Sequence, residues 1–118
     1  MKILVVDDSP AMRRIIIGNL SRLGHTDVVE GENGWSGLEQ LGRGGVGLII
    51  TDWDMPEMDG IAFAREVRSR DAAIPILMVT THAATQDIVQ ALEAGVSTYV
   101  VKPFTQESLK EKLDSLLG

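Results

Sequence analysis

Three aspartates stand directly after apolar runs in this sequence. Asp7 and Asp8 follow the run from Ile3 to Val6, and Asp52 follows the run from Gly47 to Thr51. Aspartate is common in turns and helix caps, so any one of them has a purely structural explanation. Three neighbouring carboxylates, however, repel one another and raise their own pKa values unless a cation is present. Oxygen ligands suit Mg²⁺, Mn²⁺ or Ca²⁺, and an open site with few carboxylates favours Mg²⁺.

Two further polar side chains occupy equivalent places after other apolar runs. Thr80 ends the run from Ile74, and Lys102 follows the run from Thr98 to Val101. A carboxylate can attack phosphorus to give an aspartyl phosphate. Phosphoryl transfer then requires mainly neutralisation of the phosphoryl oxygens, for which a metal ion, the Lys102 ammonium and the Thr80 hydroxyl are suited. Asp52 is the favoured nucleophile because it ends a central strand and is the only acid between two buried segments.

The apolar runs that position these residues read as strands. They are rich in β-branched residues and continuous rather than alternating, which is typical of strands buried on both faces of a parallel sheet. Helical spacing follows each run, so the order is β-α repeated five times. This predicts an α/β fold with an open, doubly wound parallel sheet and right-handed crossovers, whose ligand site lies at the carboxyl ends of the strands. The expected strands are 2–6, 27–30 (a weak edge strand), 47–51, 74–80 and 98–101.

The helices between these strands have recognisable start signals. Ser9 and Pro10 offer an N-cap followed by proline at the first helical position, and apolar residues at helical spacing continue to Leu23. A shorter helix is expected over Ser36 to Leu41. The remaining three are expected after Asp59, at Thr85 and after Thr105, each beginning with a side chain able to cap.

Composition narrows the class of protein. The chain has 118 residues, of which 44% are apolar, so residues 1–118 are expected to form one domain. No apolar run approaches the roughly 20 residues that cross a bilayer, and the N-terminus lacks a signal-peptide pattern, which favours a cytoplasmic protein. A net charge of −6 argues against direct nucleic-acid binding. The absence of cysteine excludes thiolate chemistry.

The combined motifs resemble those of two-component response-regulator receiver domains. They are Asp7-Asp8 after Ile-Leu-Val-Val, Asp52 in Thr-Asp-Trp-Asp-Met-Pro-Glu-Met-Asp-Gly, Thr80 after Leu-Met-Val, and Val-Val-Lys102-Pro103-Phe-Thr. The resemblance covers the whole chain. It is nearest to the stand-alone chemotaxis regulators, and it implies a flavodoxin-like (βα)5 sheet with strand order 2-1-3-4-5.

The resemblance also implies a site. Asp52 would accept a phosphoryl group from a histidine kinase of the chemotaxis type. Mg²⁺ would be bound by Asp8, Asp52 and the backbone carbonyl of Asp54, with Asp7 acting through water. Lys102 and Thr80 would contact the phosphoryl oxygens.

An output mechanism is implied as well. The Lys102-Pro103 bond is expected to be cis. When Thr80 moves to the phosphoryl group, Tyr99 would turn inward as a switch and reshape the face formed by the fourth helix, fifth strand and fifth helix. That face would bind the flagellar motor switch protein or another output protein, with a phosphatase as a possible further partner. Such a protein is a monomeric signalling switch rather than an enzyme with an external substrate.

Other interpretations stay open at this stage. Asp52-Trp53-Asp54 also matches the Asp-x-Asp of haloacid-dehalogenase-type phosphatases, although there it normally ends the first strand of a longer chain. The chain is alternatively a phosphorelay shuttle or phosphate sink, or the receiver fragment of a longer DNA-binding regulator. Asp54 and His82 occupy positions that in the family tune how fast water attacks the acyl phosphate.

Overall fold

Strands and helices alternate along the whole chain in the computed structural model, which describes residues Met1–Gly118. The strands are rich in Val, Ile and Leu, and the helices between them carry apolar residues on one face. The elements are β1 (Lys2–Val6), α1 (Pro10–Arg22), β2 (Val28–Gly31), α2 (Gly34–Gly42), β3 (Val46–Asp52), α3 (Gly60–Arg70), β4 (Ile76–Thr80), α4 (Thr85–Glu93), β5 (Thr98–Val101) and α5 (Gln106–Leu117).

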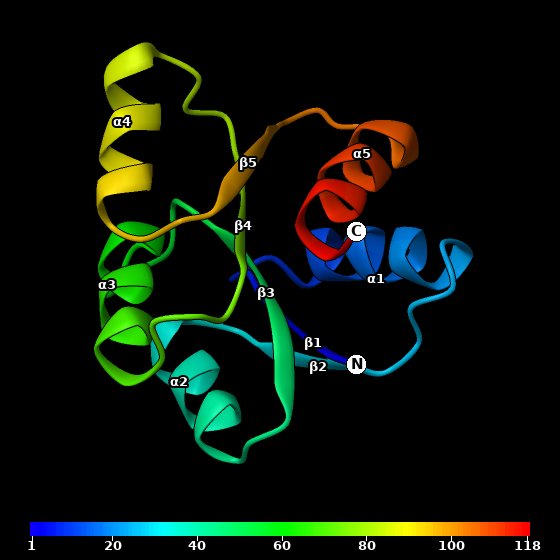
Figure 1. Ribbon diagram of the computed structural model, residues 1–118, viewed down its shortest axis with the longest axis horizontal. Helices are drawn as coiled ribbons and strands as arrows, with labels where there is room; N and C mark the ends of the chain where they lie inside the picture. Colours follow the sequence, from blue (N-terminus) through cyan, green and yellow to red (C-terminus); the bar gives the residue numbers. More distant parts are fainter.

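The five strands form one parallel sheet in the order β2-β1-β3-β4-β5. Helices α1 and α5 cover one face, and α2, α3 and α4 cover the other (Figure 1). The doubly wound parallel sheet predicted from the sequence pattern and the strand order implied by the family resemblance are both confirmed. Because β3 lies in the centre of the sheet, the residue that ends it has a strand on either side.

Apolar residues fill the space on both faces of the sheet. Alternate residues of each strand face opposite ways, so Leu4 and Ile49 join the cluster beneath α2, α3 and α4, whereas Ile3 and Ile50 join the cluster beneath α1 and α5. All four of these side chains are fully buried. This two-sided burial explains why the strands read as continuous apolar runs.

The register of the strands brings their carboxyl ends together. Val6 pairs with Thr51, Asp52 pairs with Val79, and Thr80 pairs with Val101. The residues that end or follow β1, β3, β4 and β5 therefore lie along one edge of the sheet.

Three helices begin at the capping residues predicted from the sequence. The side chains of Ser9, Asp59 and Thr105 accept hydrogen bonds from backbone N–H groups at the starts of α1, α3 and α5. Such bonds satisfy donors that the first helical turn leaves without a partner.

The start of α2 and the cap of α4 differ from the sequence prediction. Helix α2 begins at Gly34 rather than Ser36, because Asn33 and Ser36 form a reciprocal capping box. Helix α4 does begin at Thr85, but its N-cap is Ala84 and no side chain caps it, so the prediction of a capping side chain was wrong there. Strand β2 is shifted by one residue from the expected 27–30.

No helix has both the length and the apolar character needed to cross a membrane.

Candidate functional site

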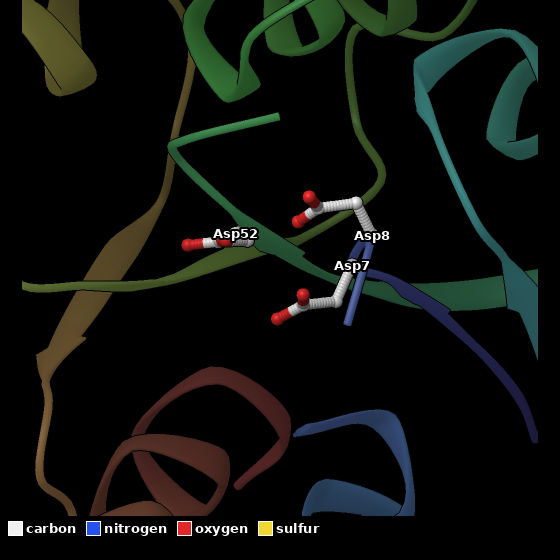
Figure 2. A group of neighbouring side chains, drawn as sticks. All are labelled: Asp7, Asp8 and Asp52. Carbon is white, nitrogen blue, oxygen red and sulfur yellow. The ribbon is translucent and has the colours of Figure 1, made fainter. Parts of the chain in front are cut away.

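A group of three carboxylates lies at the carboxyl edge of the sheet. Asp7 and Asp8 follow β1, Asp52 ends β3, and one oxygen from each lies within 4.8 Å of the others. Figure 2 shows the three side chains near one another, Asp7 and Asp8 after β1 and Asp52 at the end of β3. Asp7 and Asp52 are buried, whereas Asp8 is exposed. The structure thus joins the three aspartates that the sequence singled out and leaves one side of the group open to solvent.

Asp7 is the most confined of the three carboxylates. Its Oδ1 atom accepts a hydrogen bond from the Ser9 N–H at 2.9 Å, but its buried Oδ2 atom has no hydrogen-bond partner. Burial raises the pKa of the Asp7 carboxyl, the carboxylates of Asp52 and Asp8 raise it further, and the Ser9 N–H and Lys102 lower it. A buried carboxylate oxygen without a partner is unfavourable. A cation, directly or through water, would supply what this oxygen lacks.

Asp52 is held through one of its two oxygens. Its Oδ1 atom accepts hydrogen bonds from the Trp53 N–H at 2.8 Å and from the Lys102 ammonium at 3.1 Å. Lys102 comes from the end of β5, on the opposite side of β3 from Asp7 and Asp8. No hydrogen bond falls on the other oxygen, Oδ2, so one oxygen is fixed and the second keeps its lone pairs available.

Thr80 lies beside Lys102 at the end of β4. The Lys102 N–H donates to the Thr80 carbonyl at 2.8 Å, which aligns the two residues. The Thr80 Oγ1 atom accepts a hydrogen bond from the His82 N–H at 2.8 Å, and its own proton is left to donate elsewhere. The peptide bond between Lys102 and Pro103 is cis.

Three residues form a contact across the β3–α3 and β4–α4 loops that sequence reasoning missed. The rings of Trp53 and His82 stack with centroids 4.4 Å apart, and His82 Nε2 lies 3.0 Å from a carboxylate oxygen of Asp54. The His82 side chain is 34% exposed. Because 28 residues separate Asp54 from His82, no local spacing signals their contact.

Tyr99 lies on β5, away from the carboxylates. Its side chain is half-buried against the apolar cluster beneath α2, α3 and α4, and the Lys112 ammonium of α5 lies 5.2 Å from the centre of its ring. The structure therefore separates Tyr99 from the acidic group, while Val100 and Val101 connect it along β5 to Lys102.

Comparisons with known proteins identify the family. Residues 3–114 match the family model of the response regulator receiver domain. The chain is 51% identical to the chemotaxis protein CheY1 of Helicobacter pylori over all of this chain and 98% of that one. It is 50% identical to the chemotaxis protein CheY homolog of Campylobacter jejuni over all of this chain and 93% of that one.

Solved structures show the same fold. The high-resolution structure of the chemotaxis protein CheY4 of Vibrio cholerae covers 98% of this chain and 98% of its own, with a TM-score of 0.92 and 31% sequence identity. The Asp7, Asp8 and Asp52 group with Lys102 lies within the matched residues. The chain therefore belongs to the family of response regulator receiver domains.

Proposed function

We propose that this protein is a phosphorylation-activated response regulator of chemotaxis, in which Asp52 accepts the phosphoryl group. One observation carries the proposal: Asp52 Oδ1 is held by the Lys102 ammonium at 3.1 Å, while Asp7 and Asp8 lie beside the same side chain. A nucleophile between a fixed cation and an acidic group suits phosphoryl transfer, where charge neutralisation lowers most of the barrier.

Mg²⁺ is the proposed cofactor. Its ligands would be Asp8, Asp52 and the backbone carbonyl of Asp54, with Asp7 acting through water. Three carboxylates face a single ammonium, and the Asp7 Oδ2 atom is buried without a partner, so the donor set fits a hard divalent cation. When bound, the ion supplies positive charge to the phosphoryl oxygens and offsets the repulsion among the acids.

The transfer step uses groups of this chain at stated atoms. The Asp52 Oδ2 atom attacks the phosphorus of a phosphohistidine on the kinase; the new O–P bond forms as the P–N bond breaks, and the released imidazole nitrogen takes up a proton. Lys102 neutralises one phosphoryl oxygen and the Thr80 hydroxyl donates a hydrogen bond to another. The product is an aspartyl phosphate on this chain and an unmodified histidine on the kinase.

The output is proposed to run from Thr80 to the face formed by α4, β5 and α5. Thr80 and Lys102 are hydrogen-bonded neighbours, and Tyr99 lies on the same strand that ends before Lys102. A shift of Thr80 toward the phosphoryl group would let the Tyr99 ring turn inward. The relatives named as chemotaxis proteins support a histidine kinase of the chemotaxis type as donor and the flagellar motor switch protein as the partner.

The lifetime of the aspartyl phosphate is proposed to depend on Asp54 and His82. Their side chains contact each other at 3.0 Å, and His82 stacks on Trp53 directly after the acceptor. These residues come from the loops that follow Asp52 at the end of β3 and Thr80 at the end of β4, and we propose that they limit how water or a phosphatase reaches the phosphorus.

Residues 1–118 are further proposed to act as one cytoplasmic, monomeric receiver that does not itself bind nucleic acid and turns over no external substrate. The phosphatase interpretation is disfavoured because Asp52-Trp53-Asp54 follows the third strand, β3, whereas the Asp-x-Asp of such phosphatases normally ends the first strand.

The central test is labelling of the chain by acetyl phosphate, followed by intact-protein mass spectrometry. We expect up to one phosphoryl group per chain, dependent on Mg²⁺ and absent from Asp52→Asn. Asp59→Asn is the matched control, since it removes one carboxylate in the same β3–α3 region and asparagine still caps α3. Undiminished labelling of Asp52→Asn would overturn the site assignment, and many turnovers per chain on a small phosphate ester would favour the phosphatase.

The output partner requires a second experiment. Pull-down of a motor-switch peptide with and without beryllofluoride, which mimics the phosphoryl group, should show stronger capture when beryllofluoride is present. Equal capture in both conditions would favour the phosphate sink or shuttle.

A further inference from the structure

Arg13 makes two contacts that the phosphoryl-transfer scheme does not use. It lies on α1, and one guanidinium nitrogen donates a hydrogen bond to the backbone carbonyl of Asp7 at 2.5 Å. Its Nε atom donates to the Glu30 carboxylate of β2 at 2.9 Å. The Arg13 side chain is only 14% exposed. One side chain thus links α1, β2 and the loop that carries the two acids after β1.

The Asp7 carbonyl belongs to the peptide unit that leads into Asp8. The Asp7 N–H donates to the Gly31 carbonyl at 3.1 Å, which continues the ladder between β1 and β2. Beyond that point the chain leaves the sheet, and Arg13 supplies the partner for the Asp7 carbonyl. Asp8 is exposed, so its direction depends on the peptide unit before it rather than on packing around its own side chain.

The ion pair between Arg13 and Glu30 adds little to stability. The Glu30 side chain is 52% exposed, and ion pairs with solvent-exposed partners contribute about 0–1 kcal/mol. The neighbouring Arg14 is exposed and forms no ion pair. Arg13 differs from Arg14 in that it donates a hydrogen bond to the carbonyl of the Asp7–Asp8 peptide unit.

We propose that Arg13 is a positioning residue for the metal site: by holding the Asp7 carbonyl, it orients the Asp7–Asp8 peptide unit and thereby the Asp8 carboxylate toward Asp52. The inference rests on the proposed function, since it assumes that the acidic group binds Mg²⁺. Groups that orient the ligands of a metal affect its affinity although they do not touch it.

The charge of Arg13 and its hydrogen bond to the Asp7 carbonyl predict opposite changes in Mg²⁺ affinity when the residue is replaced. A cation near a metal site repels the metal, so loss of the Arg13 charge alone would strengthen Mg²⁺ binding. Loss of a positioning hydrogen bond would weaken it. The sign of the change therefore separates the two roles.

The test measures Mg²⁺ affinity by fluorescence of Trp53 in a Trp35→Phe background, so that only the tryptophan beside the acceptor reports. Arg13→Met keeps the apolar stem, and Arg14→Met is the matched control, with the same charge change on the same helix. We expect about a tenfold weaker affinity for Arg13→Met and an unchanged or slightly tighter affinity for Arg14→Met. Arg13→Lys, which retains one donor, should fall between wild type and Arg13→Met.

A second measurement separates the effect on Mg²⁺ affinity from an effect on the phosphoryl-transfer step. At saturating Mg²⁺ the labelling rate of Arg13→Met by acetyl phosphate should approach that of wild type, while the half-saturating Mg²⁺ concentration rises by the same factor as the affinity falls. Affinity in Arg13→Met equal to or tighter than in Arg14→Met would overturn the positioning role. Should Arg13→Met fail to fold, Arg13→Lys is compared with Arg14→Lys, which also keeps its charge, and an affinity equal to or tighter than that of Arg14→Lys would overturn the positioning role. Failure of the wild-type chain to bind Mg²⁺ would overturn the metal site itself, and the Arg13 role with it.

Discussion

The folded chain disfavours the ionised form of Asp7. Burial raises the pKa of the Asp7 carboxyl, the carboxylates of Asp52 and Asp8 add to this effect, and the Ser9 N–H and Lys102 oppose it. When an acid has a higher pKa in the folded chain than in the unfolded chain, folding is more favourable below the unfolded pKa. That contribution is lost as the pH rises from about 4, the ordinary value for aspartate, through the raised pKa.

Asp7→Asn should therefore stabilise the metal-free protein at neutral pH. Asparagine keeps an acceptor for the Ser9 N–H and removes the buried charge. We expect a higher Tm at pH 7.5, by about 4 °C for each kcal/mol gained, and a difference that shrinks toward pH 4. Thermal unfolding in EDTA across this range checks it. The same variant should bind Mg²⁺ more weakly, so a gain in stability together with a gain in metal affinity would contradict this account of Asp7.

The site residues were predictable from the sequence to different degrees. Asp7, Asp52, Thr80 and Lys102 follow apolar runs, and parallel strands place such residues at one edge. The contacts of His82 and Arg13 were not predictable, because they join loops and helices whose relative position depends on packing across the sheet.

At the scale of single elements, α4 lacks the stabilisation that three other helices receive from predicted caps. Its N-cap is Ala84, which has extended backbone angles but no side chain to accept a hydrogen bond. The sequence favoured Thr85 as the cap because threonine is a common capping residue, yet Thr85 is already the first helical residue.

Ala84→Ser should stabilise the protein by supplying the missing acceptor. The expected gain is about 0.5–1 kcal/mol in the free energy of unfolding, measured by urea denaturation. Asp59→Ala removes the existing cap of α3 and serves as the comparison, with an expected loss of about 1 kcal/mol in the free energy of unfolding. An unchanged urea midpoint in Ala84→Ser would show that the start of α4 is already satisfied by water.

Helix α2 was predicted too short, over Ser36 to Leu41, and the prediction stopped short of the glycine at each end of the observed helix, Gly34 and Gly42. Gly37 is required by packing: a Cβ atom there would lie 2.9 Å from the Val6 side chain and 3.0 Å from the Phe63 ring. The close approach of α2 to the sheet thus depends on Gly37, although glycine has a low helix propensity.

Gly37→Ala and Gly18→Ala should shift stability in opposite directions. Alanine at position 37 overpacks the core, with an expected loss of about 1–3 kcal/mol. At position 18, in α1, a Cβ would meet only the far end of the Arg22 side chain at 3.8 Å or more. Helix propensity then predicts a gain of about 0.8–1 kcal/mol. Urea denaturation of both variants tests the contrast; a stabilised Gly37→Ala would mean that α2 can move away from the sheet.

For the molecule as a whole, the sequence predicted five β-α units, but the order of the strands came from family resemblance. Continuous apolar runs show that a strand is buried on both faces without showing which strands flank it. The order β2-β1-β3-β4-β5 places the end of β3 between the acids that follow β1 and the strands that lead to Thr80 and Lys102. The site is consequently formed by the order of the strands in the sheet, and no single β-α unit contains it.

The same topology connects the proposed phosphorylation site with a distant face. Lys112 of α5 lies 5.2 Å from the centre of the Tyr99 ring. An ammonium above an aromatic ring at an exposed site contributes about 0.5–1 kcal/mol. If inward rotation of Tyr99 accompanies phosphorylation, the ring must leave this ammonium, so the contact favours the unphosphorylated state.

Lys112→Met should therefore raise the affinity of the protein for beryllofluoride, because coupling between two sites is reciprocal. The expected increase is about two- to fivefold, corresponding to the free energy of the lost contact, measured by Trp53 fluorescence. Lys110→Met is the matched control: it removes the same charge from α5, but Lys110 pairs with the exposed Asp114 instead of an aromatic ring. Equal effects of the two variants would assign the change to net charge, whereas an increase confined to Lys112→Met would place the cation above Tyr99 within the switch.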